Sequence, residues 1–152
     1  MIRILVVEDQ PEKAKNITEF LYSYYGNDVE ISIENSLRSG IIKIVTSSDI
    51  QLIVLDMSMP KFTADTGEWG EAEPVSFAGE EIMQQMMIRD ISIPTLVLTQ
   101  YSIFEKGSIT LEDLDHKFRK NFGGFYKGAV YYSSSSSEWK TKMQTLLGAL
   151  SS

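Results

Sequence analysis

Short apolar runs alternate with longer amphipathic segments along this chain. We predict strands for the apolar runs at residues 2–7, 29–33, 51–56 and 93–99. Apolar side chains recur every three to four residues, which predicts helices that each pack one face, over residues 11–25, 37–45, 79–90, 110–121 and 137–150. A short fifth strand is expected at 125–126, after Gly123 and Gly124, and it could continue toward Tyr132.

The alternation of strands and helices predicts the fold class. Strands that alternate with helices form a parallel sheet with right-handed crossovers. Five such units predict an α/β doubly wound fold, with a five-stranded parallel sheet in the order 2-1-3-4-5 and helices on both faces. We expect one domain over residues 1–152, with an irregular acidic segment at 61–78 between the third strand and the third helix.

Methionine and aromatic side chains at helical spacing predict core positions and not a cofactor site. In the third helix we expect Ile82, Met83, Met86 and Met87 to point inward. Val45 is expected to lie on the inward face of the second helix. Thr110 and Asp113 resemble a capping box that opens the fourth helix.

The composition argues against several classes of function and of site. The chain has 152 residues, of which 43% are hydrophobic and 23% charged, as in a globular protein with one core. A net charge of -7 argues against a nucleic-acid partner, because such surfaces need clustered Lys and Arg. Without cysteine the chain has no disulfide or thiolate metal site, and one histidine cannot build a multi-histidine site.

The N-terminal residues and the apolar runs bear on localisation. MIRILVVED turns acidic after a short apolar run, so it predicts neither a signal peptide nor a membrane anchor. No apolar run approaches the roughly 20 residues that span a bilayer. We therefore expect a cytoplasmic protein without a membrane partner. We also expect a monomer or a weak homodimer.

Acidic side chains follow two strands that should be neighbours in the sheet. Residues 52–60 read LIVLDMSMP, with Asp56 at the end of the third strand, and Glu8 and Asp9 end the first. A lone aspartate at such a place often caps the next turn. Three converging carboxylates, however, repel one another unless a cation lies between them. Mg²⁺ prefers hard oxygen ligands, so the sequence predicts a magnesium site here.

Two further groups are expected at the same sheet edge. Thr99 ends the fourth strand with a hydroxyl, and Lys127 follows the short fifth strand with an ammonium. Phosphoryl transfer to a carboxylate needs a nucleophile, a metal that neutralises charge, and fixed donors. This set of residue types supplies all three.

These motifs resemble those of response-regulator receiver domains, the phosphoacceptor modules of two-component signalling. The resemblance covers nearly the whole chain, through VVEDQPE, LIVLDMSMP, Gly79-Glu80, TLVLT and FYK. It implies the CheY-like fold and a stand-alone single-domain form. The implied donor is a sensor histidine kinase or a phosphotransfer protein, and the output is contact with a downstream protein partner.

The resemblance also implies a role for each site residue. Asp56 would be the phosphorylated nucleophile. Asp9 would bind Mg²⁺ directly and Glu8 largely through water, with the backbone carbonyl of Ser58 as a further ligand. Thr99 would donate a hydrogen bond to the phosphoryl group, and Lys127 would pair with it.

The chain departs from the family pattern in four places, one of which is an unusually long stretch between Thr99 and the fourth helix. Gly79 lies 23 residues beyond Asp56, so some fifteen extra residues stand beside the site. Gly128 replaces the proline that usually follows the lysine. Gly124 stands where the family has an aromatic switch residue, and Phe122, Phe125 or Tyr126 are candidates to take its part.

Two other interpretations stay open, and the sequence contradicts a third. A pseudo-receiver would keep the fold and bind partners without phosphate; the changes around Lys127 favour it slightly, and the intact set of Glu8, Asp9, Asp56, Thr99 and Lys127 disfavours it. An aspartyl-phosphate hydrolase would carry a second aspartate at Ser58, so the serine disfavours it. A flavin-binding module needs a phosphate loop after the first strand, and the acidic EDQPEKAK contradicts one.

Overall fold

The computed structural model describes residues 1–60, 74–75, 77–100, 103–104 and 109–151, and it has the three layers that the sequence predicts. The central strands are β1 (Ile2–Val7), β2 (Val29–Glu34), β3 (Leu52–Leu55), β6 (Thr95–Thr99) and β9 (Tyr126–Tyr131). The helices are α1 (Pro11–Tyr25), α2 (Leu37–Thr46), α3 (Ala78–Ile88), α4 (Leu111–Phe122) and α5 (Glu138–Ser151).

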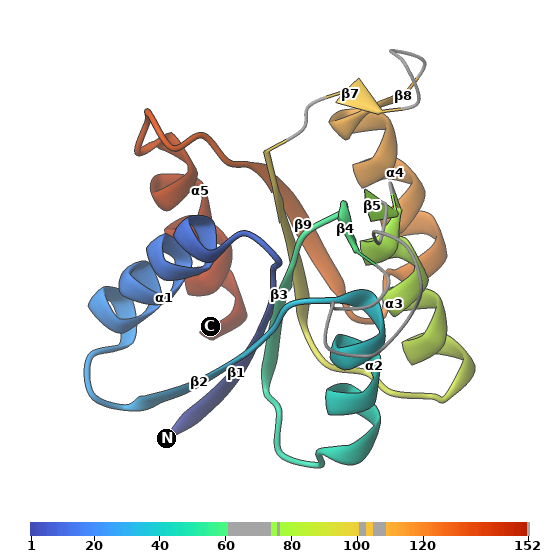
Figure 1. Cartoon of the computed structure of the whole chain (residues 1–152), viewed down its shortest axis with the longest axis horizontal. Coiled ribbons are helices and arrows are strands. Elements are labelled where there is room, and N and C mark those ends of the chain that lie inside the picture. The colour runs from blue at the N-terminus through green and yellow to red at the C-terminus, as the bar shows by residue number, and fades with distance from the viewer. Residues whose placement is uncertain (61–73, 76, 101–102, 105–108, 152) are drawn as a thin grey trace.

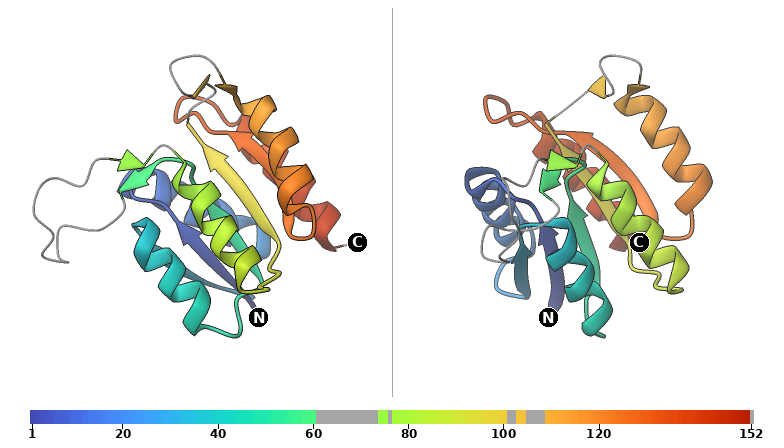
Figure 2. Two further views of the ribbon diagram at one scale, coloured as in Figure 1. Left: turned by 90° about the vertical axis from the view of Figure 1, so that its right-hand side faces the viewer. Right: turned by 45° about the vertical axis from the view of Figure 1, so that its right-hand side comes forward.

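The five central strands form one parallel sheet. Its order is β2-β1-β3-β6-β9, which confirms the predicted 2-1-3-4-5 arrangement. Two short antiparallel pairs lie outside this sheet: β4 (Met59–Pro60) with β5 (Pro74–Val75), and β7 (Ile103–Phe104) with β8 (Ile109–Thr110). Helices α1 and α5 cover one face of the sheet, and α2, α3 and α4 cover the other (Figures 1 and 2).

The sheet has a hydrophobic core on each face. Alternate residues of a strand contribute to one core or the other, because successive side chains of a strand point to opposite faces. Leu5, Ile53 and Val97 pack toward α2, α3 and α4. Val6, Val54 and Leu98 pack toward α1 and α5. Within the described chain, no helix has the length and apolar character needed to cross a membrane.

Two predicted core positions are wrong. Met87 is 52% exposed and Val45 is 45% exposed. Each directly follows a buried residue, Met86 or Ile44, and one residue turns a helix by about 100°. The next side chain therefore leaves the narrow face that the sheet covers.

The predicted capping box of α4 is present. The Asp113 amide donates to the Thr110 hydroxyl at 3.1 Å, and the Thr110 amide donates to the Asp113 carboxylate at 3.0 Å. We expect Thr110→Ala to lower the free energy of unfolding by about 1 kcal/mol, since the Asp113 amide loses its acceptor. Urea unfolding would measure this loss. Thr145→Ala is the control, because the Thr145 hydroxyl only bonds back to the carbonyl of Thr141 in the same helix; equal losses would contradict the capping role.

Candidate functional site

Three carboxylates meet at the carboxyl ends of β1 and β3. These strands are neighbours in register, with Val7 opposite Leu55, so the residues that follow them lie side by side. One carboxylate oxygen from each of Glu8, Asp9 and Asp56 lies within 4.8 Å of the others. The sheet therefore brings together the acidic residues that the sequence singled out.

The inner two carboxylates are buried. Glu8 and Asp56 are each 2% exposed, and Asp9 is half-buried. The Met57 amide donates to Asp56 Oδ1 at 2.7 Å, and the Gln10 amide donates to Glu8 Oε2 at 3.1 Å. These backbone donors fix the orientation of both carboxylates.

Burial shapes the protonation of the cluster. Burial raises the pKa of Glu8 to about 7; the charge of Asp56 adds to this rise, and Lys13 opposes it. Burial also raises the pKa of Asp9 above its ordinary value. Buried carboxylates this close together are a setting that favours binding of a cation.

A lysine from α1 lies inside this cluster. Lys13 is 2% exposed, and its Nζ lies 2.7 Å from Glu8 Oε1 and 3.3 Å from Asp56 Oδ2. The same Nζ donates to the Leu98 carbonyl at 2.7 Å. One ammonium thus contacts groups that belong to β6 or directly follow β1 and β3.

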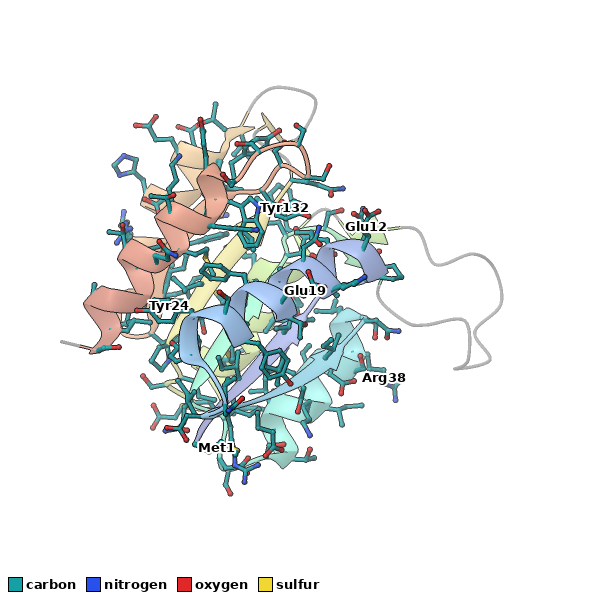
Figure 3. All side chains as sticks on the ribbon, turned by 90° about the vertical axis from the view of Figure 1, so that its left-hand side faces the viewer. Met1, Glu12, Glu19, Tyr24, Arg38 and Tyr132 are labelled. Carbon is teal, nitrogen blue, oxygen red and sulfur yellow. The ribbon has the colours of Figure 1, made fainter. Side chains whose placement is uncertain are left out.

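A tyrosine that follows β9 lies beside the site, with its ring near Lys13. Tyr132 directly follows that strand, its amide donates to the Thr99 carbonyl at 2.7 Å, and its ring centroid lies 5.4 Å from Lys13 Nζ. Its hydroxyl accepts a hydrogen bond from Asn16 of α1 at 2.8 Å. Figure 3 shows Tyr132 between the upper ends of α1 and α5.

Sequence reasoning missed both Lys13 and Tyr132. A signal for Lys13 was present, since it lies four residues before Ile17 and therefore on the buried stripe of α1. A charged residue on an apolar stripe needs a buried partner. Tyr132 carried no comparable signal, because its position depends on how far β9 extends.

The prediction that Lys127 belongs to the site is wrong. Strand β9 extends over Tyr126–Tyr131, so Lys127 lies at its beginning and not after its end. Thr95 pairs with Tyr126 and Leu96 with Gly128, which makes Lys127 the extra residue of a β-bulge. The carboxyl edge of the sheet is four residues further along, or about 13 Å at the rise of a strand.

The candidate switch aromatics lie away from the site for the same reason. The Phe125 carbonyl accepts from the amide of Thr95, at the amino end of β6. Tyr126 pairs with Thr95, and the Phe122 ring stacks on Phe125 at 5.8 Å between centroids. The aromatic residues beside Thr99 are instead Tyr131 and Tyr132.

The other predicted residues lie at the expected edge. Thr99 is fully buried at the end of β6, one residue beyond the Leu98 carbonyl that binds Lys13. Ser58 is half-buried, two residues after Asp56. Most of the predicted insertion at 61–78 lies outside the described residues, which resume with β5 and then with residue 77.

Gly79 packs the start of α3 onto the loop that carries Asp56. A Cβ at this position would lie 2.6 Å from Leu55 Cδ1 and 2.8 Å from the Asp56 carbonyl. We expect Gly79→Ala to lower the free energy of unfolding by about 1–2 kcal/mol, because overpacking outweighs the helix preference of alanine.

Urea unfolding would measure the effect of Gly79→Ala. Gly148→Ala in α5 is the matched control, since nothing lies within 4 Å of its added Cβ. We expect that control to be neutral or stabilising. A Gly79→Ala protein as stable as the control would contradict the close packing.

The fold and the acidic strand ends resemble those of one class of protein, the CheY-like receiver domains of response regulators. The chain is 15% identical to a CheY-like receiver domain protein from Methanospirillum hungatei JF-1, with a TM-score of 0.64 over 99% of this chain and 94% of that one. It matches the Mn(2+)-bound form of response regulator Rcp1 with 17% identity and a TM-score of 0.63, over 96% of this chain and 91% of that one. These structures establish the receiver fold.

The sequence relatives include proteins that are named as response regulators. The chain is 26% identical over 145 residues to the uncharacterized protein y4jR of Sinorhizobium fredii, covering 94% of this chain and 95% of that protein. It is 26% identical over 148 residues to the Detocs response regulatory protein DtcB of Vibrio alginolyticus, covering 95% and 98%. No family model matches the chain. The comparisons confirm the resemblance to single-domain receivers of response regulators.

Proposed function

We propose that this chain is a phosphoacceptor that takes a phosphoryl group on Asp56 and thereby switches a protein-binding surface. The observation that carries the proposal is the convergence of Asp56, Glu8 and Asp9 within 4.8 Å at one edge of a receiver fold. On this proposal the chain acts as a signalling domain and not as a classical enzyme. Residues 1–152 form one receiver domain with the insertion at 61–78.

The chemistry is transfer of a phosphoryl group to the Asp56 carboxylate, either from an acyl phosphate such as acetyl phosphate or from a phosphohistidine, and the product is an aspartyl phosphate. One Asp56 carboxylate oxygen attacks the phosphorus, and the bond from phosphorus to the donor's oxygen or nitrogen breaks as the donor leaves. Asp56 suits this role because the Met57 amide holds its carboxylate at 2.7 Å. The buried Thr99 hydroxyl, at the end of the neighbouring strand, would donate to the transferred group.

The donor set fits Mg²⁺. Three carboxylates and one ammonium leave a formal charge of -2 when all are ionised, and carboxylate oxygens are the ligands that hard divalent cations prefer. Glu8, Asp9 and Asp56 would hold the ion, with the Ser58 carbonyl as a further ligand. A bound Mg²⁺ supplies charge neutralisation for the phosphoryl oxygens.

The proposed partners follow from the class. Receiver domains accept phosphoryl groups from histidine kinases or phosphotransfer proteins, and we propose such a donor in the cytoplasm. Phosphorylation adds about -1.5 to -2 charge. That charge, placed at the ends of β3 and β6, would shift the conformation seen by a downstream protein partner.

Intact-mass spectrometry after incubation with acetyl phosphate tests the proposal. We expect one phosphoryl adduct with MgCl₂ and none with EDTA. Incubation with inorganic phosphate is the control for non-covalent binding. Absence of an adduct at any Mg²⁺ concentration would refute the phosphoacceptor function.

A second candidate is a pseudo-receiver that binds partners without phosphorylation. The ion pair of Asp56 with the buried Lys13 favours it, since the acceptor carboxylate already has a cation partner. The same mass measurement separates the two candidates, because a pseudo-receiver would stay unmodified.

A further inference from the structure

The environment of Lys13 has a feature that the phosphoacceptor role alone does not require. Its ammonium is buried and contacts both inner carboxylates of the cluster, at 2.7 Å and 3.3 Å. The Leu98 carbonyl and the face of Tyr132 surround the rest of the group. A divalent cation bound to the same carboxylates would meet this positive charge at close range.

We propose that Lys13 is a tethered cation that stabilises the carboxylate cluster without metal and competes with a divalent cation for Glu8 and Asp56. This inference rests on the proposed metal site and goes beyond it. It assigns to α1 a residue that sets metal affinity, and it makes the metal-bound and metal-free states differ in the partners of Lys13.

Electrostatics supports the competition. Buried carboxylates that lack a cation repel one another, and removing one partner of a buried ion pair leaves an uncompensated charge. Lys13 supplies the compensating charge from within the chain. A metal ion must therefore either move Nζ away from Glu8 or bind against its repulsion, and both weaken binding of the metal.

The surroundings of Lys13 hold the ammonium in the cluster. Its Nζ donates to a main-chain carbonyl of a central strand, a partner that cannot rotate away. Asn16, one turn along α1, bonds the Tyr132 hydroxyl and so fixes the ring that covers the ammonium. Lys13 is thus a positioning residue whose place is set by the fold and not by the metal.

Calorimetric titration with MgCl₂ alone tests this inference on the unphosphorylated full chain. We expect Lys13→Met to bind Mg²⁺ at least about tenfold more tightly than the wild type, because a positive charge a few ångströms from the ion is removed. Lys15→Met is the matched control, since Lys15 is an exposed lysine of the same helix. Its affinity should stay within twofold of the wild type.

Thermal unfolding provides a second readout, the rise in unfolding temperature that MgCl₂ causes, which a merely structural role of Lys13 would not change. In EDTA, Lys13→Met should unfold at a lower temperature than the wild type. Addition of MgCl₂ should raise its unfolding temperature by more than it raises that of the wild type. If the variant is unfolded in EDTA, refolding on addition of MgCl₂ supports the inference and failure to refold overturns it.

The outcomes separate this inference from the proposed function. Equal or weaker Mg²⁺ affinity in Lys13→Met overturns the competition, even if the wild type is phosphorylated normally. Absence of Mg²⁺ binding in both proteins overturns it as well. Tighter binding in the variant, with no phosphoryl adduct in the wild type, supports the tethered cation and refutes the phosphoacceptor role.

Discussion

Asp56→Asn should abolish the phosphoryl adduct while the protein stays folded. An asparagine amide has nearly the shape of the carboxylate, and its carbonyl can still accept from the Met57 amide. It lacks the nucleophilic oxygen that attacks phosphorus. Lys13 loses one ion pair, at 3.3 Å, but keeps Glu8 and the Leu98 carbonyl.

The measurement is intact-mass spectrometry with acetyl phosphate and MgCl₂, paired with circular dichroism. Asp49→Asn is the control, because Asp49 is an exposed aspartate that pairs only with Arg3 at the surface. Asp49→Asn should be labelled like the wild type. An adduct that persists in Asp56→Asn would mean that another side chain is the nucleophile, and Glu8 and Asp9 of the same cluster are the candidates.

The fold could be predicted because its signals are local. Each helix carries apolar side chains at helical spacing, and the three inner strands, β1, β3 and β6, are short and largely apolar runs between polar segments. The order of the sheet followed from the alternation of these elements, and the carboxylate cluster followed from the order. Glu8 and Asp56 are 48 residues apart, yet they meet because β1 and β3 are neighbours.

The cation of the site could not be predicted in the same way. The motif FYK suggested Lys127 because a lysine after a short fifth strand would lie at the carboxyl edge. The length of β9 determines where Lys127 lies, and β9 continues to Tyr131. Gly128, with a φ of +145°, accommodates the bulge that allows the strand to continue past Lys127. The extent of β9 depends on its pairing with β6, which lies some thirty residues earlier in the chain, and not on the residues around Lys127 alone.

The positive charge of the site therefore comes from α1, and not from β9 as the sequence had suggested. The cation comes from the first turn of α1, a few residues after Glu8 and Asp9, and not from the far side of the sheet. The carboxyl end of β9 instead supplies Tyr132. Loss of the Lys13 side chain would therefore affect both Glu8, after β1, and Asp56, the proposed phosphoryl acceptor.

Phe118→Ala should cause the largest loss of stability that we predict. Phe118 is fully buried in α4, with its ring 5.4 Å from Tyr126 of β9 and 5.9 Å from Phe122 between centroids. Truncating a buried phenylalanine costs about 3–5 kcal/mol, from lost transfer energy and the cavity left behind. Small domains have a free energy of unfolding of only about 5–15 kcal/mol, so this substitution would remove a large part of it.

Urea unfolding would show the loss as a midpoint lowered by roughly 2 M, given slopes of about 1–3 kcal/mol per molar for small proteins. Lys120→Ala, an exposed change in the same helix, should shift it little. The Phe118 ring packs on Tyr126, at the amino end of β9, whereas the acidic cluster follows the carboxyl ends of β1 and β3, so folded Phe118→Ala protein should still accept a phosphoryl group. A loss below about 1 kcal/mol would mean that α4 is held by its ion pairs, such as Lys117 with Glu80, and not by its aromatic face.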